Sequence, residues 1–141
     1  AIDGSAASDK AAEEAVRMAA ATSSERFRST LYAVIVLPAK DAPSLTDLSI
    51  APSRKRKDNW EETQRRIYYV VDKVAGERAV CLHKKVVYGE VVEALLQFAE
   101  REGCDVIVIG SSGKGKVLRA LRGSTSARIA LEAKCSVYIV R

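Results

Sequence analysis

Two kinds of hydrophobic pattern alternate along the chain. Short runs of consecutive apolar residues rich in β-branched side chains, such as 31–37 and 106–109, are typical of strands buried on both faces of a parallel sheet. Between these runs the apolar residues recur every three or four positions, as in helices that bury one face. The alternation predicts an α/β fold with a parallel sheet and helices on both of its faces.

The same pattern places the individual elements. We predict helices over residues 8–22, 58–75, 90–102 and 124–133, and strands over residues 31–37, 79–88, 105–110 and 136–141. Ser8 and Asp9 are candidate caps for the start of the first helix, and Gly103 stands where a glycine cap is expected at the end of the third. The polar stretch 38–54 predicts a loop, and we expect the basic run 54–57 to be a solvated part of it.

The opening residues 1–5 are typical of the end of a strand that runs into a turn. They are too few for a strand of usual length, and no initiator methionine stands before them. We therefore expect further residues upstream of Ala1.

Composition restricts the class of protein. At 141 residues, with 48% hydrophobic and 29% charged residues, the sequence predicts one globular domain over residues 1–141. No apolar run approaches the roughly 18 residues that a membrane span needs, and no export signal opens the sequence. The three cysteines, Cys81, Cys104 and Cys135, are widely spaced, which favours reduced thiols in a cytoplasmic protein over a disulfide framework or a zinc site.

The net charge of +5 is unevenly distributed. Five basic residues and no carboxylate lie between Gly110 and Arg128, namely Lys114, Lys116, Arg119, Arg122 and Arg128 itself. Such a segment favours a polyanionic partner, either a nucleotide phosphate or a nucleic acid. A solvated helix face is the alternative interpretation of the same charges.

The most informative segment joins the predicted strand 105–110 to the last helix. Gly110 and Gly113 follow the strand directly, and Gly123 and Ser124 precede the helix after nine further residues. Glycines let consecutive backbone amides approach one anion, and a helix N-terminus also favours phosphate. Two such elements at the end of one strand predict a polyphosphate site; the alternative is a tight turn followed by an ordinary capped helix.

The same segment nearly matches a P-loop. Gly110, Gly115 and Lys116 have the required spacing, but Val117 stands where a serine or threonine would hold magnesium. Only about 25 residues follow, which leaves no room for the later strands of a P-loop enzyme. We therefore do not expect a P-loop NTPase.

The order and spacing of Gly110, Gly113, Gly123 and Ser124 resemble the G-x2-G-x9-G-S signature of the universal stress protein family. The resemblance runs along nearly the whole chain. It includes Asp3 after the opening residues, the strand at 31–37, the turn at Gly89 and the ending 135–140.

The resemblance implies a Rossmann-like, open, parallel five-stranded sheet and a homodimer, which we expect to form through the last strand at 136–141. It also implies an adenine nucleotide (ATP, ADP or AMP, with or without Mg²⁺ held through the phosphates) at the carboxyl ends of the strands. Adenine would contact the backbone at Val36, Asp3 would face the nucleotide, and Ile109 and Gly110 would line the ribose. The phosphates would be held by Gly113, Lys114, Gly115, Gly123, Ser124 and Thr125. Members of the family are mostly regulatory or stress-survival proteins.

The sequence leaves open two alternatives to a non-catalytic nucleotide-binding protein. One is a slow ATPase that uses the same site, for which Asp3 is the one candidate base. The other is a basic module that docks a partner or a nucleic acid without nucleotide.

The single histidine, His83, has no paired nucleophile motif, and we expect it at the surface. Asp3 itself could contact the nucleotide or cap the first helix.

Overall fold

A computed structural model describes residues 1–24, 26–42, 54–78, 80–111 and 125–141, with only the backbone described for 54–59. The elements follow in the order α1 (Ala6–Thr22), β1 (Thr30–Leu37), a 3-10 turn (Ala39–Asp41), α2 (Arg54–Arg78), β2 (Cys81–Tyr88), α3 (Val91–Arg101), β3 (Val106–Gly110), α4 (Thr125–Glu132) and β4 (Ser136–Val140). The predicted α/β class is confirmed.

The described strands form two parallel pairs. In the first pair, Thr30 of β1 lies beside Cys81 of β2, and the register continues to Leu37 beside Tyr88. In the second pair, Val106 of β3 lies beside Ser136 of β4, and Gly110 lies beside Val140. No ladder of hydrogen bonds joins β1 directly to β3 within the described residues.

Ala1 and Ile2 connect the two pairs. The backbone N–H of Ile2 donates to the carbonyl oxygen of Val34 in β1 at 3.0 Å. The amino group of Ala1 donates to the carbonyl oxygen of Val108 in β3 at 2.9 Å. The described residues therefore contain four strands where five were expected. Ala1 and Ile2 lie between β1 and β3 and hydrogen-bond to both.

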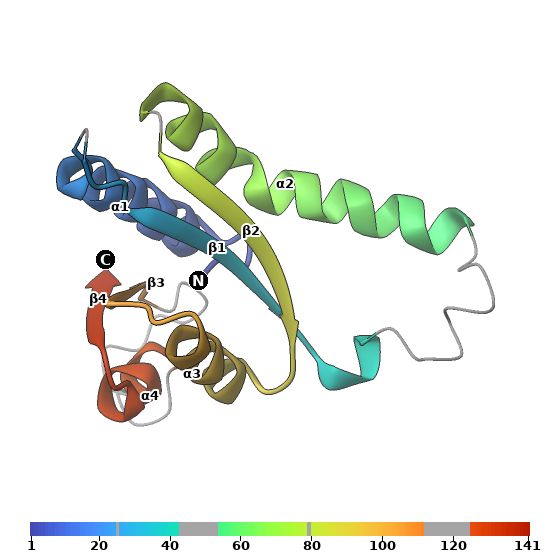
Figure 1. Cartoon of the computed structure of the whole chain (residues 1–141). Coiled ribbons are helices and arrows are strands. Elements are labelled where there is room, and N and C mark those ends of the chain that lie inside the picture. Colours follow the sequence, from blue (N-terminus) through green and yellow to red (C-terminus); the bar gives the residue numbers. More distant parts are fainter. Residues whose placement is uncertain (25, 43–53, 79, 112–124) are drawn as a thin grey trace.

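Helices cover both faces of the strands, as predicted. α1 and α2 lie on one face, and α3 and α4 on the other (Figure 1). On the first face, Ile2 packs in a buried cluster with Val16 of α1, Ile35 of β1 and Val71 of α2. On the second face, Val34 and Ile107 pack against Phe98 of α3 and other side chains of that layer. The apolar strand residues are thus buried on both sides, which explains their continuous runs in the sequence.

The first helix begins earlier than predicted because a different serine caps it. The hydroxyl of Ser5 accepts a hydrogen bond from the backbone N–H of Ser8 at 3.2 Å, so Ser5 is the N-cap and Ala6 the first helical residue. The prediction that Ser8 or Asp9 caps the helix was wrong, and Ser8 is buried inside its first turn. The glycine cap predicted after the third helix is confirmed, since Gly103 has a φ of +64°.

The second helix is longer than predicted at both ends. It begins at Arg54, so the basic run 54–57 forms its first turn and does not belong to a loop. It continues through Gly76 to Arg78. Arginine and lysine are good helix formers, which explains why the run extends the helix towards its N-terminus. Residues 43–53 of the predicted loop lie outside the described residues.

Tyr68 fastens α2 to the edge of the sheet. Its side chain is only 4% exposed, and its hydroxyl donates to the carbonyl oxygen of Lys85 in β2 at 2.9 Å. Burial, with a smaller contribution from Asp72, raises the pKa of Tyr68 to about 12, so the hydroxyl stays protonated and can donate throughout the physiological range.

We predict that Tyr68→Phe lowers the free energy of unfolding by about 1 kcal/mol, because it removes the part-buried hydrogen bond to the carbonyl of Lys85. Tyr69→Phe is the matched control, because the side chain of Tyr69, the next residue, is 64% exposed. The change at Tyr69 should alter the free energy of unfolding by less than about 0.5 kcal/mol. Urea unfolding of both variants measures the difference. Equal effects at the two positions would contradict the anchoring role of Tyr68.

Candidate functional site

A cavity of about 270 Å³ opens at the carboxyl ends of β1 and β3. Its walls come from the ends of these strands, from residues 1–3 between them, and from the first turns of α1, α3 and α4. Its size is near the lower end of the range for small-molecule sites. In parallel α/β sheets, ligands bind outside the carboxyl ends of the strands, so this is the position where a ligand site is expected.

Five of the predicted site residues meet in this cavity. Asp3, Val36, Ile109, Gly110 and Thr125 all line it, although they come from distant parts of the sequence. The other five predicted residues lie outside the described part of the chain; they are Gly113, Lys114, Gly115, Gly123 and Ser124. The segment that contains them joins Ser111 to Thr125, and both of these residues line the cavity.

Asp3 is exposed at the rim and also organises the turn into α1. Its carboxylate oxygen Oδ1 accepts a hydrogen bond from the backbone N–H of Ser5 at 2.9 Å, and its own N–H donates to the Ser8 hydroxyl at 3.3 Å. Gly4, with a φ of +76°, makes this tight turn possible. Asp3 therefore supports the capped start of α1 from a position on the cavity wall. The two interpretations of this residue do not exclude each other.

Gly110 is required by packing at the end of β3. A Cβ atom at this position would lie 2.5 Å from both the carbonyl carbon and the carbonyl oxygen of Ala7, and 3.0 Å from the Ala7 side chain. Backbone atoms of α1 cannot move away as a flexible side chain would. The glycine thus lets the first turn of α1 lie directly against β3, which brings the amides of this turn to the cavity.

The electrostatic character of the cavity favours an anion. The N-terminal turns of α1 and α4 both contribute to its walls, through Ser5, Ala7 and Ser8 and through Thr125 and Ser126. Helix N-termini carry partial positive charge and have backbone N–H groups without partners inside the helix. Asp3 contributes the one carboxylate among the described lining residues.

Several lining residues were not predicted from the sequence. Ser5, Ser8 and Ser126 supply hydroxyl groups, and Val91 and Leu95 of α3 supply an apolar wall. The serines could have been predicted from the helix starts at Ser5 and Thr125. Residues in the first turn of these helices lie at the helix end that faces the ends of the strands. The apolar residues of α3 gave no such signal, because their pattern fits any buried helix face.

Other candidate residues lie away from this cavity. His83 is exposed on β2, as predicted, and stacks on Tyr32 with 5.5 Å between ring centroids. Cys104 and Cys135 pack against the core as small apolar residues do. Burial raises the pKa of the Cys104 thiol. Within the described ranges, no three histidine, cysteine or acidic side chains converge as a metal site would require.

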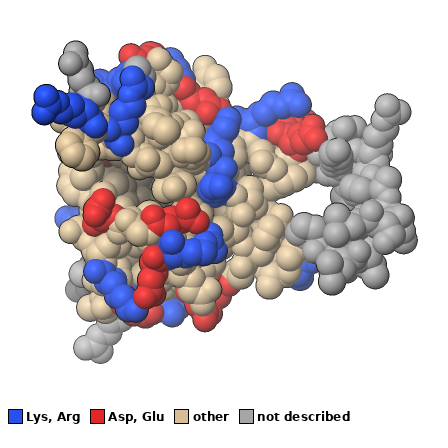
Figure 2. All heavy atoms as spheres, in the orientation of Figure 1, with Lys and Arg blue, Asp and Glu red and all other residues tan. Residues whose placement is uncertain are grey.

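Charge on the visible face of the molecule is mixed. Figure 2 shows basic and acidic side chains interspersed over this face, with no broad area of one sign among the described residues. The predicted basic segment between Gly110 and Arg128 lies mostly outside the described residues. Arg128 itself lies 3.4 Å from Glu132 and 3.8 Å from Glu90, so its charge is partly balanced.

Comparisons with known proteins agree in one family. The sequence profile of the universal stress protein family matches residues 1–141. A universal stress protein of Methanocaldococcus jannaschii is 29% identical over 139 residues, which are 99% of this chain and 78% of that protein. A solved universal stress protein of Lactobacillus plantarum has a TM-score of 0.64 at 23% identity, covering 99% of this chain and 93% of its own. A universal stress protein crystallised in complex with cAMP has a TM-score of 0.65 at 24% identity, covering 99% and 90%.

We predict that Gly110→Ala lowers the free energy of unfolding by about 1–3 kcal/mol, because the added methyl group collides with the Ala7 backbone. Gly76→Ala is the control: it lies within α2, nothing lies within 4 Å of the added atom, and the change should stabilise by up to about 1 kcal/mol. Thermal unfolding compares the two. An unchanged stability of Gly110→Ala would refute the close packing of α1 on β3.

Proposed function

This chain belongs to the universal stress protein family, and on that basis we propose that it binds an adenine nucleotide in the cavity at the ends of β1 and β3. The observation that carries the proposal is the convergence of two helix N-termini and five predicted contact residues on one cavity. The universal stress protein that was crystallised with cAMP supports an adenine nucleotide as the ligand class. We propose ATP, ADP or AMP in particular, because the glycine-rich segment resembles the signature of the family.

The wall chemistry suggests how the nucleotide lies. Val36, Ile109 and Leu95 form an apolar side that suits the base and the ribose. The first turns of α1 and α4 suit phosphate oxygens, because a helix N-terminus carries partial positive charge. Bound phosphates would also lie next to the segment that starts after Ser111, where the predicted contacts from Gly113 to Ser124 belong. A magnesium ion, if it accompanies the phosphates, would find Asp3 at the rim of the cavity.

In this proposal the protein acts as a regulator through binding. Backbone groups and helix termini hold a ligand without supplying a reacting side chain. The nucleotide would stabilise one arrangement of the residues that contact it, and partners would recognise that arrangement. We propose that the protein acts in the cytoplasm. In the described part of the chain, no helix is long and apolar enough to cross a membrane.

Thr125 offers the sharpest test of the anion site, because it begins α4 and lines the cavity. We predict that Thr125→Glu weakens ATP binding at least about tenfold, equivalent to about 1.4 kcal/mol. The added carboxylate repels phosphate, although a negative charge at a helix N-terminus preserves or increases the stability of the fold. Calorimetric titration with ATP, ADP, AMP and cAMP measures the loss.

Thr125→Gln is the matched control, since it has nearly the same size as the glutamate variant and no charge. It should keep nucleotide affinity within about threefold of the parent, a difference of roughly 0.6 kcal/mol. Equal losses in both variants would indicate a steric effect in place of an electrostatic one. Tight binding in Thr125→Glu, or none in the unmodified protein, would refute the proposed site.

We further propose that the protein is a homodimer that pairs through β4. This strand is hydrogen-bonded on one side to β3, and among the described residues no strand pairs with its other side. Tyr138 and Ile139 of β4 are 46% and 38% exposed, and Leu131 of the adjacent α4 is 86% exposed. A second copy placed across a two-fold axis would cover both the open edge and these apolar side chains.

We predict that Ile139→Lys converts the dimer into a monomer in sedimentation experiments at tens of micromolar, a rough working range for weak dimers. Tyr69→Lys is the control, because it removes an exposed aromatic residue from α2, away from the β4 edge. A parent protein that sediments as a monomer, or a dimer that survives Ile139→Lys, would exclude pairing through β4.

A further inference from the structure

Cys81 and His83 lie near the start of β2, at the opposite end of the strands from the cavity at the carboxyl ends of β1 and β3. Two residues apart on a strand, they project from the same face of the sheet, while Leu82 between them packs towards α1 and α2. Both are exposed, and Sγ of Cys81 lies 3.5 Å from Nε2 of His83. An accessible thiol and an accessible imidazole nitrogen therefore meet at one point of the surface.

The distance between these two atoms fits a zinc ion. Zinc binds cysteine sulfur at about 2.3 Å and histidine nitrogen at about 2.0–2.1 Å, with tetrahedral angles. These values place the two ligand atoms about 3.5–3.6 Å apart, and the structure has them at 3.5 Å. The two atoms share a hydrogen bond in the protein alone, and Cys81 would release its thiol proton to solvent when zinc binds.

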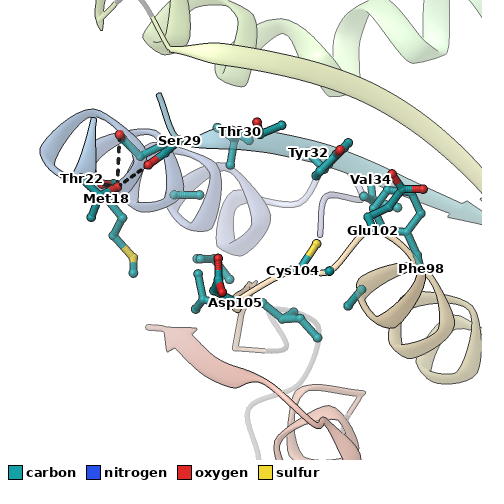
Figure 3. Close-up of a pocket in the computed structure, with 18 of the residues that line it drawn as sticks. Met18, Thr22, Ser29, Thr30, Tyr32, Val34, Phe98, Glu102, Cys104 and Asp105 are labelled. Carbon is teal, nitrogen blue, oxygen red and sulfur yellow. Dashed lines mark hydrogen bonds between the residues drawn. The ribbon is translucent and has the colours of Figure 1, made fainter. Parts of the chain in front are cut away.

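Tyr32 of β1 holds the imidazole ring in position. Tyr32 lies beside His83 in the register of the two strands, and the rings stack with 5.5 Å between centroids. On its other side Tyr32 meets Phe98 edge to face, at 5.4 Å between centroids; Figure 3 labels Tyr32 on β1 and Phe98 on α3. Since Phe98 is buried, His83 rests on a ring that is itself packed against the core. The direction of Nε2 is thus set before a metal binds.

One chain supplies only part of such a site. A structural zinc site has four protein ligands, and within the described residues no third histidine, cysteine or acidic side chain joins Cys81 and His83. β2 is hydrogen-bonded to β1 on one side, and no described strand pairs with its other side. The missing ligands can therefore come from a molecule that approaches this edge.

The main chain of β2 favours a second copy of the same strand. The N–H of Gly89 donates to the carbonyl oxygen of Leu37 at 2.8 Å. Counting back from Gly89 in steps of two, His83 directs its main-chain groups to β1, and Leu82 directs its own to the open edge. When two copies of β2 pair in antiparallel fashion through Leu82, Cys81 of each copy stands opposite His83 of the other. Such pairs have Cα atoms only about 4.5 Å apart, so four ligands surround one point.

We propose that Cys81 and His83 are half of a zinc site, which the same two residues of a second copy of this chain complete across a two-fold axis at the edge of β2. Two cysteines and two histidines are a common ligand set of structural zinc. The contact is self-complementary, because Cys81 meets His83 in both directions. It is separate from the pairing through β4, which belongs to the other pair of strands, and it does not depend on nucleotide binding.

Lysine residues make this contact depend on the metal. Lys84 and Lys85 follow the pair directly and are both exposed. Lysine on an edge strand opposes pairing with another edge, so two copies of β2 are not expected to associate by themselves. Zinc changes the balance, because its four bonds hold the two edges together and the two thiolates neutralise its charge.

A zinc titration of the tag-free protein, with a phosphine reductant and without nucleotide, tests the proposal. In sedimentation experiments we expect the mass to increase at least about twofold and to stop changing at one zinc ion per two chains. A chelator should reverse the increase. In Ile139→Lys, which removes the contact through β4, zinc should produce a dimer and nothing larger. The reductant excludes a disulfide between two Cys81 thiols as the cause.

Cys81→Ser and His83→Gln each remove one ligand from an exposed position, so each should abolish the zinc-dependent increase in mass and leave the circular dichroism spectrum unchanged. Cys135→Ser is the matched control, because it removes a thiol that packs against the core, and it should keep the increase. Cobalt in place of zinc gives a second measurement. The visible absorption of tetrahedral, sulfur-bound cobalt should appear in the parent and in Cys135→Ser, and not in Cys81→Ser.

Three results would overturn the proposal. One is a zinc-dependent mass that persists in Cys81→Ser or His83→Gln. Another is zinc bound at one ion per chain with no change in mass, which would exclude the second copy as the source of ligands. The third is a parent protein that binds neither zinc nor cobalt.

Discussion

Two main-chain hydrogen bonds, from Ile2 to Val34 and from Ala1 to Val108, link the two halves of this protein. Each half is a pair of parallel strands, and within the described residues these halves share no ladder of their own. The two bonds fix the distance between β1 and β3 at Val34 and Val108. Helix packing on both faces then follows, since Ile2 belongs to the cluster under α1 and α2, and Ala1 contacts the cluster under α3 and α4.

The same two residues determine the geometry of the cavity at the carboxyl ends of β1 and β3. The chain leaves them through Asp3 and the positive-φ turn at Gly4, and Ser5 then caps α1. This short path brings the first turn of α1 against Gly110 at the end of β3, with no room for a Cβ atom. Positive helix ends and strand ends therefore meet for structural reasons, and the resulting cavity is suited to an anionic ligand before any particular side chain is considered.

The sequence predicts those helices and strands whose local pattern is determined by a single physical effect. The runs at β1 and β3 identified buried strands because burial on both faces leaves no polar positions, and Gly103 identified the end of α3 because few residues adopt its φ. The start of α1 could not be resolved, because Ser5 and Ser8 are both residues that cap helices well. In the structure the Ser5 hydroxyl accepts from the Ser8 N–H, and the Ser8 hydroxyl donates to the Ser5 carbonyl. The start of α2 was missed because a basic run fits a solvated loop and a helix equally well. For the site, the resemblance to the family implied Asp3, Val36 and Gly110, which all line the cavity, while the α3 wall depends on helix packing that a sequence pattern does not specify.

The proposed adenine nucleotide lies where residues 1–3, β1, β3 and α4 meet. Its position can be mapped from the change in backbone amide chemical shifts when Mg-ATP is titrated into the isotope-labelled protein. We expect saturable shifts centred on Asp3, Val36, Gly110 and Thr125, with the amides of β2 and the second half of α2 nearly unchanged. Shifts centred instead on Thr30, Tyr32 and Val106, at the opposite end of the same strands, would contradict this position.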